Sequence, residues 1–281
     1  MNEKSTPKRG FLIPIGGAED RSENSPILSR VLQYFGGKDA RIVIIPTASQ
    51  QTEKAFEHYA DLFKGLGAAS VDSMNPSDRV EANAKKLAQK LDQASGVFLT
   101  GGNQVRLSSI LGGTLLSEKL KARFAEGVSV AGTSAGASIQ CQHMIAYGKS
   151  GSAPRLRMLQ MAPGFGLIES VIIDQHFRQR HRIGRLQTAV SLNPRLLGVG
   201  LDENTAAVIR PDNTLEVFGA GAATIIDGSQ MLYSDVYKIK PRRPVAMVGM
   251  IMHVLTEGLG YNIETREPKL QAVGKSITSG G

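Results

Sequence analysis

Cysteine, aromatic rings and long apolar runs are all scarce in this chain of 281 residues. The single cysteine, Cys141, excludes an internal disulfide, and no Cys/His spacing fits zinc, so we predict neither metal nor cofactor. No apolar stretch reaches the length of a membrane span, and the segment 1–9 has no signal-peptide core. We therefore expect a cytoplasmic protein that does not have a membrane as a partner.

Nucleic-acid binding also lacks support, although the net charge is +8. The basic residues are scattered, there is no tryptophan, and only 5% of residues are aromatic, which leaves little for base stacking. Nucleotide binding is a weak alternative, because no complete G-x-G-x-x-G is present. Gly274-Lys275-Ser276 lacks the upstream glycine of a P-loop, since Lys269 stands in its place.

Apolar, strand-like runs alternate with amphipathic segments through the first two hundred residues. This alternation predicts a parallel sheet with helices on both faces. The predicted strands are 11–13, 41–46, 97–99, 128–131, 171–173 and 196–201, and the predicted helices include 26–35, 52–66 and 80–94. From residue 206 onward, the short strands 206–209, 214–218 and 222–225 predict an antiparallel extension of the same domain. We expect one catalytic domain over 10–269, between flexible segments 1–9 and 270–281.

The pentapeptide Gly132-Thr133-Ser134-Ala135-Gly136 is the most informative motif present. It follows an apolar run and precedes a helix-like stretch, as expected for a sharp strand-to-helix turn that holds out a nucleophilic serine. A Gly/Ala-rich structural turn is the alternative interpretation. If the helix continues, Cys141 lies on the same face as Ser134, two turns later, and packs in the core.

A nucleophilic serine needs a base and an acid that orients the base. Of the five histidines, His176 is the best candidate, because it follows a predicted strand and parallel strands place their carboxyl ends at one edge of a sheet. The orienting acid stays open between Glu203, Asp202 and Asp174, and the chain order favours an acid after the histidine.

Two further segments carry site chemistry. Thr100-Gly101-Gly102 follows a predicted strand, and its backbone can turn N–H groups toward an oxyanion, with the Ala135 N–H as partner. After His176 the chain is rich in arginine. On a continuous helix Arg178, Arg182 and Arg185 would share a face and Arg180 would point away, which predicts a clamp for carboxylates.

Together these motifs resemble the cyanophycinases, a serine hydrolase family related to peptidase E and, more distantly, to class I glutamine amidotransferases. The resemblance spans about residues 10–268. Its landmarks are Gly16-Gly17-Ala18-Glu19-Asp20, Thr100-Gly101-Gly102-Asn103-Gln104, Gly132 to Ala137, Asp174-Gln175-His176-Phe177, Arg185-Leu186, Asp202 to Ala206 and the stretch 258–267.

The resemblance implies an α/β fold of three αβα layers with a mostly parallel central sheet, of the glutamine amidotransferase-like or flavodoxin-like kind. It also implies a homodimer without metal that hydrolyses cyanophycin, a polyaspartate with arginine on each side-chain carboxyl, to β-Asp-Arg dipeptides. By position Ser134 is the nucleophile, His176 the base, and Glu203 the third member, with Gly102 and Ala135 at the oxyanion. The implied substrate-binding residues are Gln104, Asp174, Gln175, Arg180, Arg182 and Arg185.

Two alternatives remain beside this hypothesis. An α-aspartyl dipeptidase would use the same chemistry on short peptides. A catalytically silent binding protein would keep the pocket alone, and it is supported by Ser152, which stands where relatives carry an acid in the loop after the serine.

Overall fold

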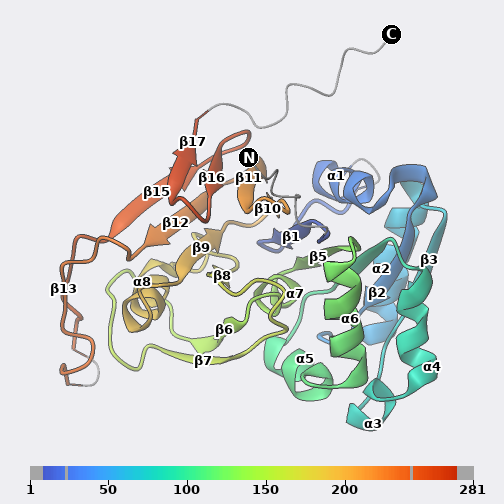
Figure 1. The fold of residues 1–281 in the computed structure, drawn as a ribbon, viewed down its shortest axis with the longest axis horizontal. Helices are drawn as coiled ribbons and strands as arrows, with labels where there is room; N and C mark the ends of the chain where they lie inside the picture. The colour runs from blue at the N-terminus through green and yellow to red at the C-terminus, as the bar shows by residue number, and fades with distance from the viewer. Residues whose placement is uncertain (1–8, 23–24, 241–242, 271–281) are drawn as a thin grey trace, which may run out of the picture.

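A nine-stranded sheet forms the centre of the molecule (Figure 1). The structure is a computed structural model that describes residues 9–22, 25–240 and 243–270. In order across the sheet the strands are β17 (Glu267–Lys269), β16 (Gly260–Asn262), β11 (Thr214–Gly219), β10 (Thr205–Ile209), β1 (Leu12–Ile15), β5 (Ser129–Thr133), β4 (Gly96–Leu99), β2 (Arg41–Ile45) and β3 (Ser70–Ser73).

The sheet changes character at β1. The strands β1, β5, β4, β2 and β3 are parallel to one another. The pairing of β1 with β10, and every pairing from β10 to β17, is antiparallel. The predicted α/β class is therefore confirmed, and the predicted strands 206–209 and 214–218 form the antiparallel extension. The third predicted strand, 222–225, belongs to a separate sheet, so its assignment to the extension was wrong.

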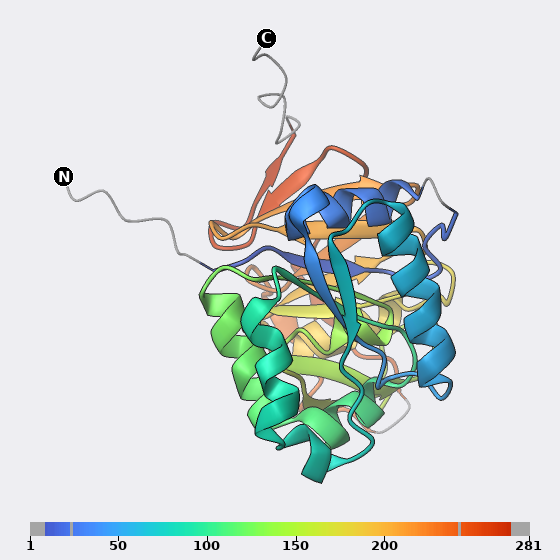
Figure 2. The ribbon, with the colours of Figure 1, turned by 90° about the vertical axis from the view of Figure 1, so that its right-hand side faces the viewer.

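Helices cover both faces of the parallel half (Figure 2). The helices α1 (Pro26–Phe35) and α2 (Thr52–Gly65) pack on one face, and α5 (Gln104–Leu111) and α6 (Leu115–Ala125) pack on the other. Strand β2 shows why, because Ile42 and Ile44 join the core under α1 and α2, while Val43 and Ile45 join the opposite core. A strand buried on both sides reads as a continuous apolar run.

The first helix forms as its capping residues predict. The Ser25 side chain accepts a hydrogen bond from the Leu28 N–H, Pro26 occupies the first helical position, and Gly36 closes the helix in the left-handed conformation at φ 114°.

The predicted helix over 80–94 was wrong as a single element. The structure has two short helices, α3 (Arg79–Ala82) and α4 (Lys85–Ala88), and a 3₁₀ segment over Gln89–Gln93. The break falls at Ala84, whose backbone is extended, beside Asn83. The Asn83 side chain bonds the Arg79 carbonyl and the Leu115 N–H instead of letting the helix run on.

A second, smaller sheet carries the histidine candidate. It has four strands in the order β15 (Ile251–Leu255), β12 (Ala223–Asp227), β9 (Leu197–Leu201) and β8 (Val171–Asp174), and only β8 and β9 are parallel. The expectation that Ser134 and His176 follow strands of one sheet was therefore wrong. The two residues still meet, because loops from both sheets converge on the end of β1.

The helix after Ser134 is also shorter than expected. The helix α7 covers only Ala135–Ser138, because the Gln140 side chain donates to the Gly136 carbonyl and closes the turn. Cys141 then pairs with Ile168 as an isolated bridge. Its thiol is fully buried, and burial raises its pKa to about 12.

The remaining elements are a 3₁₀ segment (Gly37–Asp39), the hairpin of β6 (His143–Gly148) and β7 (Leu159–Pro163), the helix α8 (Ile183–Leu192), and the pair β13 (Tyr233–Ser234) and β14 (Met247–Val248). Most of the two segments predicted to be flexible lies outside the described residues, namely 1–8 of the first and 271–281 of the second. Arg9 is described, and it donates to the Arg210 carbonyl at 2.8 Å. Among the described helices, none combines the length and apolar character needed to cross a bilayer.

Candidate active site

Ser134 occupies a strained turn between β5 and α7. Its φ of 53° and ψ of −110° are rare for a residue with a side chain, and such strain concentrates at functional sites. The turn requires the flanking glycines, because a Cβ at Gly132 would lie 2.3 Å from the Gly136 carbonyl oxygen and one at Gly136 would lie 2.2 Å from the Leu99 oxygen. The geometry is that of a nucleophile elbow.

The Ser134 hydroxyl lies next to His176, which in turn lies next to Glu203. Ser134 Oγ is 2.9 Å from His176 Nε2, and His176 Nδ1 is 2.7 Å from Glu203 Oε1. Because an ionised carboxylate can only accept, Nδ1 carries the imidazole proton and Nε2 accepts from the serine hydroxyl. This arrangement is the one required of a serine nucleophile, its base and an orienting acid.

The other two candidate acids face elsewhere. Asp202 accepts from the Arg178 N–H at 3.0 Å and from the Ala222 N–H at 3.2 Å, so it holds two loops together. Asp174 is fully buried and is bound by two arginines. Among the three, only Glu203 bonds the imidazole.

Three consecutive carbonyls at the end of β1 connect the loops of the site. The Ile15 oxygen accepts from the Ser134 N–H, the Gly16 oxygen from the His176 N–H, and the Gly17 oxygen from the Asn204 N–H, at 2.8–2.9 Å. His176 and Asn204 themselves have positive φ values of 47° and 50°. The end of β1 therefore fixes the backbone of all three loops.

Gly17 is a site residue that the sequence analysis quoted but did not assign. A Cβ at this position would lie 2.4 Å from His176 Cε1, and the backbone there has a φ of 99°. Only glycine fits against the face of the imidazole. The available signal was a glycine pair directly after the first strand.

His176 is held in its neutral form. Burial is the largest influence and lowers its pKa below the ordinary 6.5, the Arg180 and Arg182 charges lower it further, and the hydrogen bond to Glu203 opposes them. A neutral imidazole at neutral pH is ready to accept the serine proton.

The arginine segment does not form one continuous helix. Residues 177–181 form turns, with His181 at φ 49°, and α8 begins only at Ile183. The predicted helical face of Arg178, Arg182 and Arg185 was therefore wrong. Arg178 pairs with Asp202 at 3.2 Å and is largely exposed, and Arg180 is exposed as well.

Arg182 and Arg185 instead form a buried cluster with Asp174. Arg185 Nε lies 2.7 Å from Asp174 Oδ2, a second Arg185 nitrogen bonds Oδ1, and Arg182 Nη1 lies 3.3 Å from the same Oδ1. Burial lowers the pKa of Arg182 to about 10, so the guanidinium is charged at neutral pH. Arg182 Nε has no hydrogen-bond partner in the described part of the chain.

The two glutamines expected at the substrate are each bound within the protein. Gln104 donates to the Ile145 and Ala146 carbonyls at 3.1 and 2.9 Å, which ties the start of α5 to β6. The Gln175 side chain bonds the Ser138 hydroxyl at the end of α7.

Of the two expected oxyanion donors, Ala135 directly follows Ser134, and Gly102 belongs to the loop after β4. Ala135 begins α7, where the first N–H groups of a helix have no partner within it. In the loop after β4, Gly101 is the glycine that lies against Ser134, because its Cβ would be 3.4 Å from the serine Cβ, whereas Gly102 packs on the Ala48 carbonyl. The role of Gly102 and Ala135 stays a prediction.

Glu19, which the sequence offers only as part of a motif, is a buried carboxylate next to the elbow. Glu19 accepts from the Thr133 hydroxyl at 2.6 Å and from the Tyr59 hydroxyl, and its side chain has no exposed surface. Burial raises the pKa of Tyr59 well above its ordinary value, and the charge of Glu19 adds to the effect. Thr133 directly precedes Ser134, so the Glu19–Thr133 hydrogen bond helps to hold the backbone of the elbow in place.

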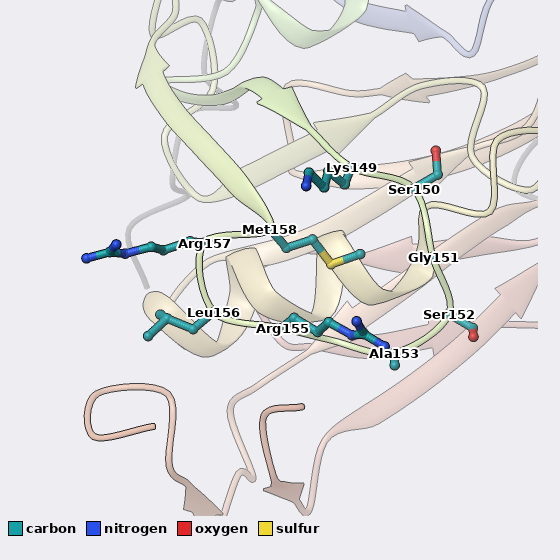
Figure 3. Close-up of a pocket in the computed structure, with 9 residues that line it drawn as sticks. All are labelled: Lys149, Ser150, Gly151, Ser152, Ala153, Arg155, Leu156, Arg157 and Met158. Atoms are coloured by element: carbon teal, nitrogen blue, oxygen red, sulfur yellow. The ribbon is translucent and has the colours of Figure 1, made fainter. Parts of the chain in front are cut away.

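The loop that contains Ser152 surrounds a pocket of about 580 Å³ (Figure 3). The pocket is lined by nine residues from the 149–158 segment, and these include Lys149, Arg155 and Arg157 but no carboxylate. The Gly151 N–H donates to the His181 carbonyl at 2.8 Å, so the loop is joined to the arginine segment. In the described residues no His, Cys, Asp and Glu group has metal-binding geometry.

Comparison with known proteins identifies a family. The model of peptidase family S51 matches residues 11–217. A cyanophycinase of Geminocystis herdmanii is 39% identical over 261 residues, which cover 92% of this chain and 96% of that protein. A cyanophycinase of Synechococcus elongatus is 37% identical over 260 residues, covering 92% of this chain and 81% of that protein.

Solved structures agree at the level of the fold. A peptidase from an acI-B1 Actinobacterium superposes with a TM-score of 0.64 at 22% identity, covering 92% of this chain and 98% of that one. A putative peptidase E protein from Listeria monocytogenes superposes with a TM-score of 0.52 at 17% identity, covering 76% and 100% of the two chains.

Proposed function

Because this chain belongs to peptidase family S51, we propose that it is a cyanophycinase, a serine-type exopeptidase that releases β-Asp-Arg dipeptides from cyanophycin. The observation that carries the proposal is the hydrogen-bonded line from Ser134 through His176 to Glu203. The identity of 37–39% with cyanophycinases over 92% of the chain supports the substrate.

In the proposed acylation step, Ser134 Oγ attacks the carbonyl carbon of a backbone peptide bond, and its proton moves to His176 Nε2. Throughout the step, Glu203 accepts a hydrogen bond from His176 Nδ1–H and stabilises the imidazolium. The N–H groups of Ala135 and Gly102 are the proposed donors to the oxyanion. The tetrahedral intermediate then collapses, the C–N bond breaks, and His176 gives its proton to the leaving amine.

Deacylation repeats the same sequence with water. His176 Nε2 takes a proton from water as the water oxygen attacks the ester carbonyl. Collapse of the second intermediate breaks the bond to Ser134 Oγ, which recovers the proton. The neutral state of His176 suits both proton transfers.

For the substrate pocket we propose Gln104, Asp174, Gln175, Arg180, Arg182 and Arg185, as the resemblance implies. Arg180 is the exposed member of this set, and its charge acts on His176. Asp174, Arg182 and Arg185 form the buried cluster, which we propose shapes the floor of the pocket.

We also propose the glutamine amidotransferase-like, flavodoxin-like class for the fold, one catalytic domain over 10–269, and a cytoplasmic location.

We further propose a homodimer that uses the outer side of the four-stranded sheet. Strand β15 is an edge strand, and an edge offers unpaired backbone groups to another chain. Met252 and Val254 on β15, and Leu232, Tyr237 and Val248 nearby in the sequence, are exposed apolar side chains. Sedimentation of the wild type and of Val254→Glu tests this, because the charged variant should sediment as a monomer.

The central experiment incubates purified protein with cyanophycin and follows soluble products by mass spectrometry, with Ser134→Ala in parallel. We expect β-Asp-Arg from the wild type and none from the variant. Cleavage of Asp-X dipeptides in preference to the polymer would indicate an α-aspartyl dipeptidase. The absence of any product and of fluorophosphonate labelling at Ser134 would indicate a binding protein.

A further inference from the structure

A polar cavity of about 690 Å³ lies beside the nucleophile, on the side of α2. Its wall comes from three separate segments: the loop after β1, the β2–α2 loop with the first turns of α2, and the loop after β4. Gly101 lines the cavity and also lies against Ser134, with 3.4 Å between its Cβ position and the serine Cβ. The cavity therefore adjoins Ser134 through Gly101.

The charge of this cavity has one sign. Arg21, Lys54 and His58 line it, and the lining contains no aspartate or glutamate. Lys54 and His58 are four residues apart on α2 and so lie on the same face of the helix. Lys54 is exposed and forms no ion pair with a described residue. Such a lining favours an anionic group.

Arg21 connects the cavity to the elbow. Its Nε lies 3.6 Å from Glu19, its guanidinium lies over the Tyr59 ring, and its side chain is 47% exposed. Glu19 in turn holds Thr133, the residue before Ser134. The cation is therefore placed at a fixed position relative to the nucleophile, with part of its surface open to a ligand.

We propose that this cavity, lined by Arg21, Lys54 and His58, binds a carboxylate of the substrate unit next to the scissile bond. The inference rests on the proposed function, because each arginine of cyanophycin carries a free carboxylate. The buried arginines are poorly suited to this task, since Arg182 and Arg185 are already bound to Asp174. The cavity offers exposed cations instead, and guanidinium and ammonium groups are the usual partners of carboxylates.

The test uses Lys54→Glu and the matched control Lys64→Glu. Both change the same charge on α2, but Lys64 lies in the last turn of the helix and does not line the cavity. The substrate is a synthetic oligomer of three Asp-Arg units in three forms: free, with the arginine carboxylates amidated, and with only the chain terminus amidated. We expect Lys54→Glu to raise KM for the free oligomer about ten times more than it raises KM for the arginine-amidated form. This factor is equivalent to ~1.4 kcal/mol.

The three forms identify the carboxylate that binds. If amidation of the chain terminus alone abolishes the KM difference between Lys54→Glu and Lys64→Glu, the cavity binds the chain end rather than an arginine carboxylate. The proposal for the unit beside the scissile bond is then overturned. Equal KM values for Lys54→Glu and Lys64→Glu on every form would overturn the whole inference.

A binding measurement separates this inference from the proposed function. The Ser134→Ala protein, with and without Lys54→Glu, is titrated with the free oligomer by calorimetry. If the wild type hydrolyses no cyanophycin, the proposed function fails, but a weaker affinity in the Lys54→Glu protein still supports a carboxylate site. Unchanged affinity together with normal hydrolysis would reject the site and leave the proposed function standing.

Discussion

Two adjacent parallel strands carry carboxylates at their ends, Asp174 as the last residue of β8 and Glu203 just after β9, yet the surroundings of the two acids are opposite. Asp174 has no exposed surface and is bound by Arg182 and Arg185. Glu203 keeps 34% of its side chain exposed and bonds only the imidazole of His176 through its carboxylate. We therefore expect Asp174 to hold the loop together and Glu203 to serve the proposed reaction.

The sharpest test of the catalytic side of this comparison is Glu203→Gln. An amide can donate to Nδ1, which favours the wrong imidazole tautomer, so we expect kcat on cyanophycin to fall about 10⁴-fold. The thermal midpoint should change little, because the side chain is partly exposed. Steady-state kinetics and thermal unfolding on the same protein check both statements. A small loss of kcat would remove Glu203 from the proposed mechanism.

The structural side is tested by Asp174→Asn. Loss of the charge leaves two buried guanidinium groups without a full counter-ion, so we expect the free energy of unfolding to fall by about 3–5 kcal/mol. Urea denaturation measures the loss, and Asp61→Asn, an exposed change on α2, is the control. A stable Asp174→Asn protein that has lost only substrate affinity would instead give Asp174 a direct role in binding.

The positions of these acids show what the sequence could and could not predict. The elbow, the histidine and Glu203 follow recognisable strands and match a family pattern, so their segments were predictable. The environment of Asp174 was not, because it depends on where the chain turns between His176 and Ile183. The left-handed residue His181 ends the assumed helix, and no local pattern indicates it.

Long-range contacts account for the other errors. The expected helix over 80–94 had a suitable apolar pattern, but the Asn83 side chain bonds Leu115, which is far away in the sequence. The sheet that contains β8 could not be inferred, because a strand pattern does not specify its partner. Gly17 and Glu19 were visible only as a motif, since their importance comes from His176 and Thr133 packed against them.

The fit around the imidazole is tested by Gly17→Ala. The new Cβ would overlap the ring and push His176 away from Ser134, and a displacement of this kind costs about a hundredfold in kcat. Gly67→Ala is a matched control, because Gly67 has the same φ of 99° but no atom within 4 Å of its Cβ position. Both variants should lose stability by about 1 kcal/mol from backbone strain. Equal kcat values for the two would show that the ring tolerates the methyl group.

The smallest effect concerns pH. The Arg180 charge helps to keep the pKa of His176 below 6.5, so the rising limb of kcat/KM against pH should lie below that value. In Arg180→Gln one source of this lowering is gone, and the limb should move to higher pH. Arg157→Gln, an exposed change in the 149–158 loop, should leave the limb in place. If the limb does not move in Arg180→Gln, the Arg180 charge does not influence the pKa of His176.

The three carbonyls at the end of β1 have a consequence for how the protein acquires its activity. They accept bonds from residues that follow more than 100 positions later, so the chain must close very long loops before Ser134, His176 and Asn204 come together. Non-local pairing of this kind slows folding. During refolding, native helix content should therefore appear before enzymatic activity, and the recovery of hydrolysis would report the final docking of the loops after β5, β8 and β9 onto the end of β1.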